Sequence, residues 1–161
     1  MVSLIKLIMK KAFLILAVLI GSAAAALAQP KAIGGRLGFN CADFSYQNYV
    51  LGNDFLEIDL GIDNGSDMGN FHADGIYNFM ILRPDWTTSG SWGFYAGPGA
   101  SIAVWNKDDE TTVHAGFLGN VGLEYNFDFP LQLSVDLRPR LMFSGNDHSP
   151  VSLGVGVRYA F

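Results

Sequence analysis

Nine charged residues recur in this chain at positions that alternate with apolar ones. Four are arginines and five are carboxylates: Arg36, Glu57, Asp59, Asp74, Glu124, Asp136, Arg138, Arg140 and Arg158. A guanidinium group carries five N–H donors in a fixed fork that matches a carboxylate, so this set is suited to enclosed ion pairing. We expect the nine side chains to share one interior face and to neutralise one another, because an unpaired buried charge is costly.

The residues that could carry catalysis or hold a metal form no recognisable motif. His72, His114 and His148 lack the spacing of metal ligands, and no serine stands in a nucleophile-elbow context. The segment 63–69 has the acidic start of a calcium loop but lacks the distal glutamate of an EF-hand. We therefore predict that the chain is not an enzyme and has no cofactor and no metal, the histidines being polar filler of the interior.

The N-terminus has the pattern of an export signal. Lys6, Lys10 and Lys11 precede the apolar run 12–20, and Ala26-Leu27-Ala28 forms a small-residue cleavage site. We predict that residues 1–28 are a cleaved signal peptide, translated from Met1 or from Met9, and that residues 29–161 form one domain. A membrane-spanning helix is the alternative for this leader, although its second half is mostly alanine.

Charge and cysteine content narrow the class of protein. The formal net charge is −5, and removal of the leader lysines makes the mature chain more acidic still. An acidic exported protein is a poor candidate for nucleic-acid binding, so no nucleic-acid partner is expected. Cys41 is the only cysteine and can form no intrachain disulfide. We interpret Cys41 as a bystander at a turn.

Beyond Lys31 the apolar residues alternate with polar or small ones, which is the period of a β-strand. Clusters of Gly, Asn, Asp and Pro separate eight such segments: 33–40, 44–47, 56–62, 70–81, 94–104, 113–126, 131–141 and 152–161. Most approach the roughly 9–11 residues that a tilted strand needs to cross a bilayer, and 44–47 is the weakest. Single-chain bacterial barrels have even strand numbers, which supports eight. The sequence predicts an all-β fold, an eight-stranded antiparallel up-and-down β-barrel.

Two prolines argue against uninterrupted strands. Pro98 and Pro139 fall inside the fifth and seventh segments. Proline donates no hydrogen bond to a neighbouring strand, and a closed barrel has no free edge on which to place it. We expect a bulge or a bend at each position.

Alternation alone fits either a soluble barrel with an apolar lumen or a transmembrane barrel with an apolar exterior. Three features favour the transmembrane barrel: the strand charges include no lysine, aromatic residues gather at the strand ends, and the chain ends in an alternating run that stops at Phe161. One expected aromatic rim holds Tyr49, Trp86, Trp92, Phe127, Phe129, Tyr159 and Phe161. The other holds Phe39, Phe44, Phe71, Trp105 and Phe143.

Three parts of the chain resemble known outer-membrane proteins. The run Leu153-x-Val155-x-Val157-x-Tyr159-x-Phe161 resembles the C-terminal signal that outer-membrane proteins present to the barrel-assembly machinery. The segments 92–100 and 122–131 resemble strands of small OmpA/OmpX-like, porin-family outer-membrane barrel domains. This resemblance covers essentially the whole mature chain and implies a Gram-negative outer membrane, reached after export through the inner membrane. The peptidoglycan-binding domain of OmpA itself is missing, so no cell-wall tether is implied.

An eight-stranded barrel has an interior just wide enough for side chains. Inward glycines are expected to make room for the arginines and Tyr95, at positions 34, 38, 97, 99, 116, 122, 154 and 156. We therefore expect a charged, largely plugged lumen and a structural role in envelope integrity or surface interaction. The alternatives are a narrow ion or water channel, a membrane-embedded lipid-modifying enzyme, and a soluble lipocalin-like binding barrel.

The expected external loops are acidic. They contain Asp63, Asp67, Asp108, Asp109, Glu110 and Asp147. One hypothesis is that they hold divalent cations that bridge to lipopolysaccharide phosphates, and the other is a solvated acidic rim. The expected partners are outer-membrane lipid, lipopolysaccharide and the barrel-assembly machinery, with the protein a monomer.

Overall fold

The computed structural model describes residues 30–63, 70–107, 110–143 and 151–161. Their regular structure is eight strands: β1 (Pro30–Gly38), β2 (Cys41–Leu51), β3 (Asp54–Asp63), β4 (Asn70–Leu82), β5 (Ser91–Lys107), β6 (Glu110–Asn126), β7 (Gln132–Met142) and β8 (Val151–Ala160). The predicted number of strands is confirmed, and the weak segment 44–47 belongs to an 11-residue strand, β2. The described residues include no helix long and apolar enough to cross a membrane. The predicted leader lies outside them.

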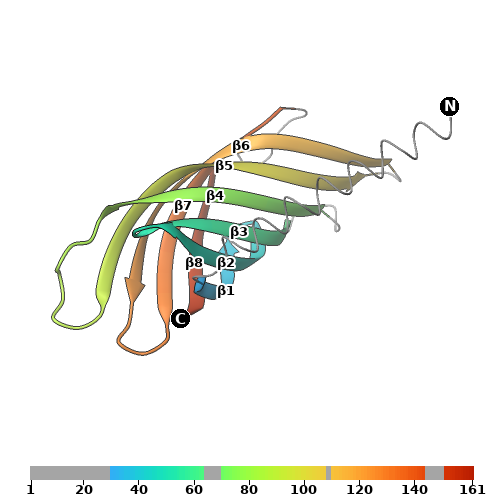
Figure 1. Ribbon diagram of the computed structural model, residues 1–161. Coiled ribbons are helices and arrows are strands. Elements are labelled where there is room, and N and C mark those ends of the chain that lie inside the picture. The colour runs from blue at the N-terminus through green and yellow to red at the C-terminus, as the bar shows by residue number, and fades with distance from the viewer. Residues whose placement is uncertain (1–29, 64–69, 108–109, 144–150) are drawn as a thin grey trace, which may run out of the picture.

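Every strand pairs antiparallel with its neighbours in sequence, and β1 pairs with β8 to close the barrel (Figure 1). At this seam Ile33 lies opposite Tyr159, and Leu37 lies opposite Val155. Closure removes the free strand edges that would otherwise pair with other chains. The first residue of β1 and the last of β8 lie at one end of the barrel, here called the termini end. The opposite end is called the loop end.

The two longest strands form one hairpin. β5 and β6 have 17 residues each, against 9 to 13 in the other strands. They pair from Ser91 and Asn126 at the termini end to Lys107 and Glu110. This hairpin extends beyond its neighbours at the loop end (Figure 1).

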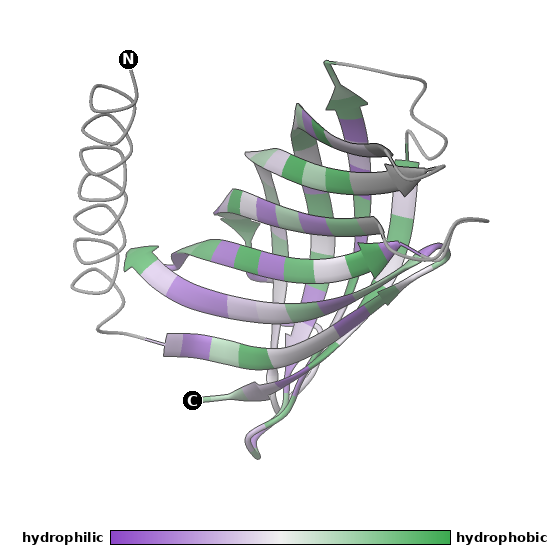
Figure 2. Ribbon diagram, turned by 90° about the vertical axis from the view of Figure 1, so that its right-hand side faces the viewer, coloured by the Kyte–Doolittle hydropathy of each residue, from purple (hydrophilic) through white to green (hydrophobic). Residues whose placement is uncertain are grey.

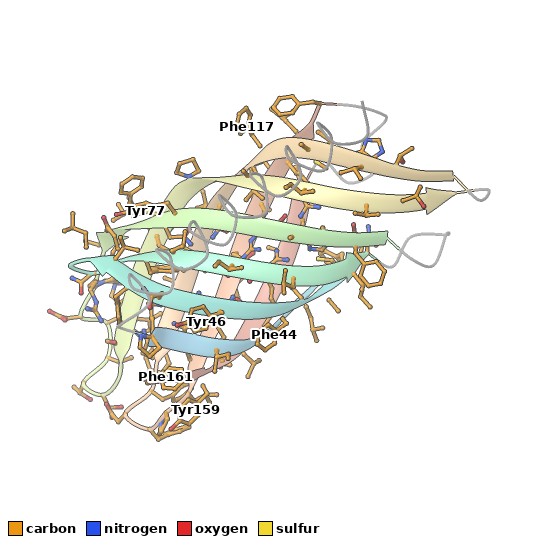
Figure 3. The ribbon with its side chains drawn as sticks, turned by 45° about the vertical axis from the view of Figure 1, so that its right-hand side comes forward. Phe44, Tyr46, Tyr77, Phe117, Tyr159 and Phe161 are labelled. Carbon is orange, nitrogen blue, oxygen red and sulfur yellow. The ribbon has the colours of Figure 1, made fainter. Side chains whose placement is uncertain are left out.

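Side chains alternate between the two faces of the barrel wall. In β7 the apolar Leu133, Val135 and Leu137 are exposed, whereas the intervening polar residues are buried. The same alternation gives the green and purple bands along the strands in Figure 2. Phe44 and Phe117 extend away from the barrel (Figure 3) and are more than half exposed. The choice left open by the sequence is therefore decided: the exterior is apolar and the lumen is polar.

Neither Pro98 nor Pro139 lies at a bulge, so this part of the prediction of a bulge or a bend is wrong. Strand pairing is interrupted beside Pro98 between β4 and β5, and beside Pro139 between β6 and β7, but the register is the same on both sides of each gap. Gly119 lies between them: it pairs with Pro98, and a Cβ placed on it would be 3.3 Å from Cγ of Pro139. Because Gly119 has no side chain, the barrel wall accommodates both proline rings and loses only a few backbone hydrogen bonds between neighbouring strands. The register shifts occur instead at the termini end, in β1, β2 and β4.

Candidate functional site in the barrel lumen

The centre of the lumen is built around Glu57 of β3. Its carboxylate accepts hydrogen bonds from Arg138 and Arg158, each at 2.8 Å. Ser45, Gln47 and Asn78 also donate to it. These donors come from four strands, β2, β4, β7 and β8, so one buried carboxylate on β3 links side chains from across the barrel. Such a group is stable inside a protein only when its charge is paired and its lone pairs are bonded, and both conditions hold here.

Arg138 of β7 extends this cluster toward the loop end. Besides Glu57, it contacts Asp59 through a short ion pair and Asp136 at 3.2 Å. Asp136 in turn pairs with Arg36 at 2.6 Å. Arg36 is 1% exposed and also pairs with Asp43 at 3.0 Å. The ion pairs therefore form one connected network through the middle of the barrel.

A separate pair lies on the side of the lumen formed by β4, β5 and β7. Arg140 donates to Asp74 at 2.7 Å, and Ser101 donates to the other oxygen of the same carboxylate at 2.6 Å. The Arg140 side chain is 16% exposed, so this pair is the more open part of the charged interior.

A lysine enters the lumen at the termini end, contrary to the prediction that the strands contain none. Lys31 of β1 is buried and pairs with Glu124 at 2.5 Å. It also donates to Gln47 and lies 4.1 Å from the centre of the Phe55 ring. The β1 register shifts between Pro30 and Ala32, which turns Lys31 to the inner face. Strict alternation counted back from Arg36 places Lys31 outside, so the sequence pattern missed it.

Four buried apolar side chains lie in the lumen beside the central network. Phe55 and Tyr95 are fully buried, and their rings meet edge to face at 5.1 Å. Ile76 and Leu118 are also buried, and both lie within 3.1 Å of the position that a Cβ on Gly99 would take. Apolar packing therefore accompanies the ion pairs inside the described lumen.

The predicted inward glycines divide into two groups. A Cβ on Gly38, Gly122, Gly154 or Gly156 would meet inward side chains, including those of Tyr95, Arg36 and Arg158. The other four glycines are Gly34, Gly97, Gly99 and Gly116. A Cβ on any of these would first meet backbone atoms of the neighbouring strand. The most extreme is Gly97, where a Cβ would be 1.7 Å from the carbonyl oxygen of Tyr77. Half of these glycines therefore accommodate the lumen side chains as expected, and half permit close approach of the strands.

The structure places all nine charged residues proposed for the lumen on its inner face. Asp74 pairs separately with Arg140, and Glu124 pairs with Lys31. The other six form one connected network: Arg36, Glu57, Asp59, Asp136, Arg138 and Arg158. Sequence reasoning missed Lys31 and Asp43. The alternation could have predicted Asp43, because this residue lies two positions before the inward Ser45 in the same strand. With these two, five cationic side chains face six carboxylates in the described lumen.

Cys41 and His72 form a small polar group at the loop end. Cys41 is the first residue of β2, is buried, and contacts Arg36 at 3.4 Å, so it is part of the packed interior rather than a bystander at a turn. The His72 ring lies between Asp43, at 3.0 Å, and Asp63, at 3.3 Å. Gly61 makes this possible, because a Cβ there would overlap both Asp43 and His72.

The other candidate residues are scattered. His114 is mostly buried and contacts Thr112 at 3.0 Å. His148, Asp67, Asp108, Asp109 and Asp147 lie outside the described residues, and nothing is described for the side chain of Glu110. In the part of the chain that the structure describes, no three His, Cys, Asp or Glu side chains are grouped to hold a metal ion.

Aromatic side chains line the termini end of the barrel. Trp86, Trp92, Tyr125, Phe127 and Phe129 contact one another in succession, with ring centres 4.7 to 5.4 Å apart. We call these five residues the aromatic row. Tyr159 and Phe161 form a further pair at 5.3 Å on β8 and the residue after it. At the loop end, Phe117 and Phe143 meet at 5.0 Å, and Phe39, Phe44 and Phe71 are exposed.

Comparison with known proteins gives one similar structure. No family model matches the chain. No curated protein matches it either. Among solved structures, the crystal structure of the N-terminal β-barrel domain of Pseudomonas aeruginosa OprF is 18% identical, with a TM-score of 0.49. The match covers 82% of this chain and 95% of that domain.

Proposed function

We propose that this protein is a transmembrane barrel of the bacterial outer membrane that contributes to the structure of the envelope and is closed to ion flow. The observation that carries the proposal is the arrangement of its faces, with an apolar exterior and a charged interior. A barrel that is soluble in water would have the opposite arrangement, with a polar exterior. Extensive exposed apolar surface marks a site of contact with membrane or protein, and here it surrounds the whole barrel.

The closed wall supports a position within a bilayer. In hydrocarbon each backbone N–H and C=O must be satisfied by the protein itself, and a closed barrel satisfies them between strands. The strands have 9 residues or more, about the length that a tilted strand needs to cross a membrane. The aromatic row and the exposed rings at the loop end correspond to the two girdles of such barrels. In bacterial barrels of this type the termini end faces the periplasm.

The packed lumen supports a structural role over a channel. Ion pairs join β1, β2, β3, β7 and β8 through the centre, and the Phe55–Tyr95 contact lies beside them. Each charged group has an opposite partner within 4 Å, so an ion entering the lumen would have to displace an existing pair. A narrow channel for water or small ions is the alternative function.

The proposal extends to assembly. The exposed face of β8 carries Leu153, Val155, Val157 and Tyr159, and Phe161 follows the strand. We propose that this row is the signal read by the barrel-assembly machinery, and that the folded protein is a monomer in contact with lipid and lipopolysaccharide. We propose no enzymatic role.

The test is fractionation of cells, followed by electrophoresis of heated and unheated samples and by planar-bilayer recording. We expect the protein in the outer membrane, a band that shifts on boiling, and no steady conductance. A soluble periplasmic protein without a band shift would contradict the membrane placement. A shifted band accompanied by large steady conductance would leave the barrel intact and replace the closed lumen with a channel.

A further inference from the structure

The turn between β4 and β5 carries two charges that the rest of the described chain does not neutralise. Arg83 donates to Asn53 at 3.1 Å and to Ser91 at 3.3 Å, both of which are neutral. Asp85 lies two residues further on, and no ion pair of the described residues involves either side chain. Two other carboxylates at the termini end also have no ion-pair partner, but both are hydrogen-bonded to backbone N–H groups: Asp54 to Met80 and Asp128 to Gly90. The turn therefore presents a separate cation and anion at the termini end of the barrel.

These two residues line a hollow of about 210 Å³. Its other lining residues are Pro84, Thr87, Gly90, Ser91 and Trp92. One wall is the indole of Trp92, a member of the aromatic row, whose Nε1 donates to Thr87 Oγ1 at 3.2 Å. Indole rings of this kind lie at the level of lipid headgroups, with the apolar ring toward hydrocarbon and the N–H toward water.

The hollow is held in shape by contacts of this turn with β6 and with the turn that follows β6. Gly90 has a left-handed backbone, with φ of 67°, and its N–H donates to Asp128 at 2.9 Å. Ser89 accepts hydrogen bonds through its carbonyl from Tyr125 at 2.9 Å and Thr87 at 2.8 Å. A side chain at position 90 would collide with the ring of Tyr125. A ligand entering this hollow would find its walls already in place, which lowers the entropic cost of binding.

We propose that this hollow binds the headgroup of a zwitterionic phospholipid of the periplasmic leaflet that carries a primary ammonium group, as phosphoethanolamine does. Arg83 pairs with the phosphate, Asp85 accepts hydrogen bonds from the ammonium group, and Trp86 and Trp92 contact the start of the acyl chains. A guanidinium held by neutral acceptors keeps its charge available for a phosphate. This inference rests on the proposed membrane placement, because only there does the aromatic row lie at headgroup depth.

The experiment is native mass spectrometry of the purified barrel with an equimolar mixture of phosphatidylethanolamine, phosphatidylglycerol and phosphatidylcholine of identical chains. We expect one retained phosphatidylethanolamine in preference to the other two. Phosphatidylglycerol offers no ammonium group, and the methylated ammonium of phosphatidylcholine cannot donate to Asp85. An excess of soluble phosphoethanolamine should not displace the lipid, because it has no chains to contact the indoles. Equal retention of the three lipids, or displacement by the soluble compound, would overturn the proposal.

Two variants separate the two charges. Arg83→Gln should lower retention of phosphatidylethanolamine about tenfold, the usual effect of losing a charged hydrogen bond. Asp85→Asn should abolish the preference over phosphatidylglycerol while phosphatidylglycerol remains bound. Arg140→Gln is the control, since it removes the same charge from the lumen and should leave retention unchanged.

Failure of this proposal and failure of the proposed function give different results. Each sample is first run unheated and boiled on a gel. A barrel that shifts on boiling but shows no lipid preference contradicts the headgroup site alone. A chain that never forms the heat-modifiable band contradicts the membrane barrel itself.

Discussion

The guanidinium of Arg36 lies against the backbone of Gly154, across the seam that joins β1 to β8. A Cβ on Gly154 would be 2.5 Å from Cζ of Arg36 and 2.6 Å from one of its terminal nitrogens. The absence of a side chain at Gly154 therefore lets Arg36 reach Asp136 on β7 and Asp43 on β2. One small residue on the last strand thus determines where a charge from the first strand can lie.

The first prediction tests this contact. Gly154→Val should displace Arg36 from its two carboxylates and lower the free energy of unfolding by about 1–3 kcal/mol, as overpacking of a core does. Gly75→Val is the matched control, because Gly75 is exposed and a Cβ there meets nothing within 4 Å. Urea titration of tryptophan fluorescence in lipid vesicles measures both. Equal destabilisation by the two variants would contradict the prediction.

The second prediction concerns the central arginine. Arg138→Met leaves Glu57, Asp59 and Asp136 with fewer cationic partners, and we expect a loss of about 3–5 kcal/mol, typical of breaking a buried ion pair. Arg140→Met removes a single, more exposed pair and should cost less. The same urea titration ranks the two. A smaller effect at Arg138 than at Arg140 would show that the network is not centred where we place it.

The third prediction treats Lys31 and Glu124 as a coupled pair. Each single variant, Lys31→Met or Glu124→Gln, leaves one buried group without its partner at 2.5 Å. The double variant should lose less unfolding free energy than the two single variants lose together, because the effects of substituting two residues in contact are not additive. A double-mutant cycle on unfolding free energies gives the coupling, expected at about 0.5–3 kcal/mol. If the losses in unfolding free energy simply add, the contact between Lys31 and Glu124 contributes nothing to stability.

The fourth prediction concerns conductance. Phe55 and Tyr95 meet at 5.1 Å inside the lumen, and in the proposed function their rings help to close it. Replacing both residues with alanine should open a water path and raise the single-channel conductance above that of the wild-type protein. Phe44→Ala is the control, since it removes an equal ring from the exterior. If the double variant stays closed in planar bilayers, the ion pairs alone block the lumen.

The fifth prediction concerns assembly in cells. Phe161→Ala removes an exposed ring but keeps the backbone N–H that donates to the Lys31 carbonyl at 3.1 Å, and it should slow the appearance of the heat-modifiable band. Phe129→Ala is the control, because Phe129 is also an exposed ring at the termini end but lies outside the proposed signal. Pulse-chase labelling followed by gel electrophoresis measures the rate. Equal rates for the two variants and the wild type would contradict the role of Phe161.

The sequence by itself determined the strands and their two faces. An alternation of period two places every second side chain on the same side of a strand, so Asp136, Arg138 and their apolar neighbours were assigned to opposite faces without coordinates. Where the alternation is unbroken, as in β3 and β8, each assignment holds in the structure. The same rule places the nine charges on one common face, and the structure decided that this face is the interior.

Only the tertiary structure decided which charges meet and which residues break the pattern. Partners such as Arg36 and Asp136 are 100 positions apart, and their contact depends on closure of β1 against β8 and on the stagger of the strands. A shift of register by one residue reverses the faces, and this is why Lys31 points inward. Pro98 and Pro139 needed no bulge because Gly119 lies between them on β6. Local periodicity encodes the face of a side chain, but its neighbours are set by strand register, which is a property of the whole closed sheet.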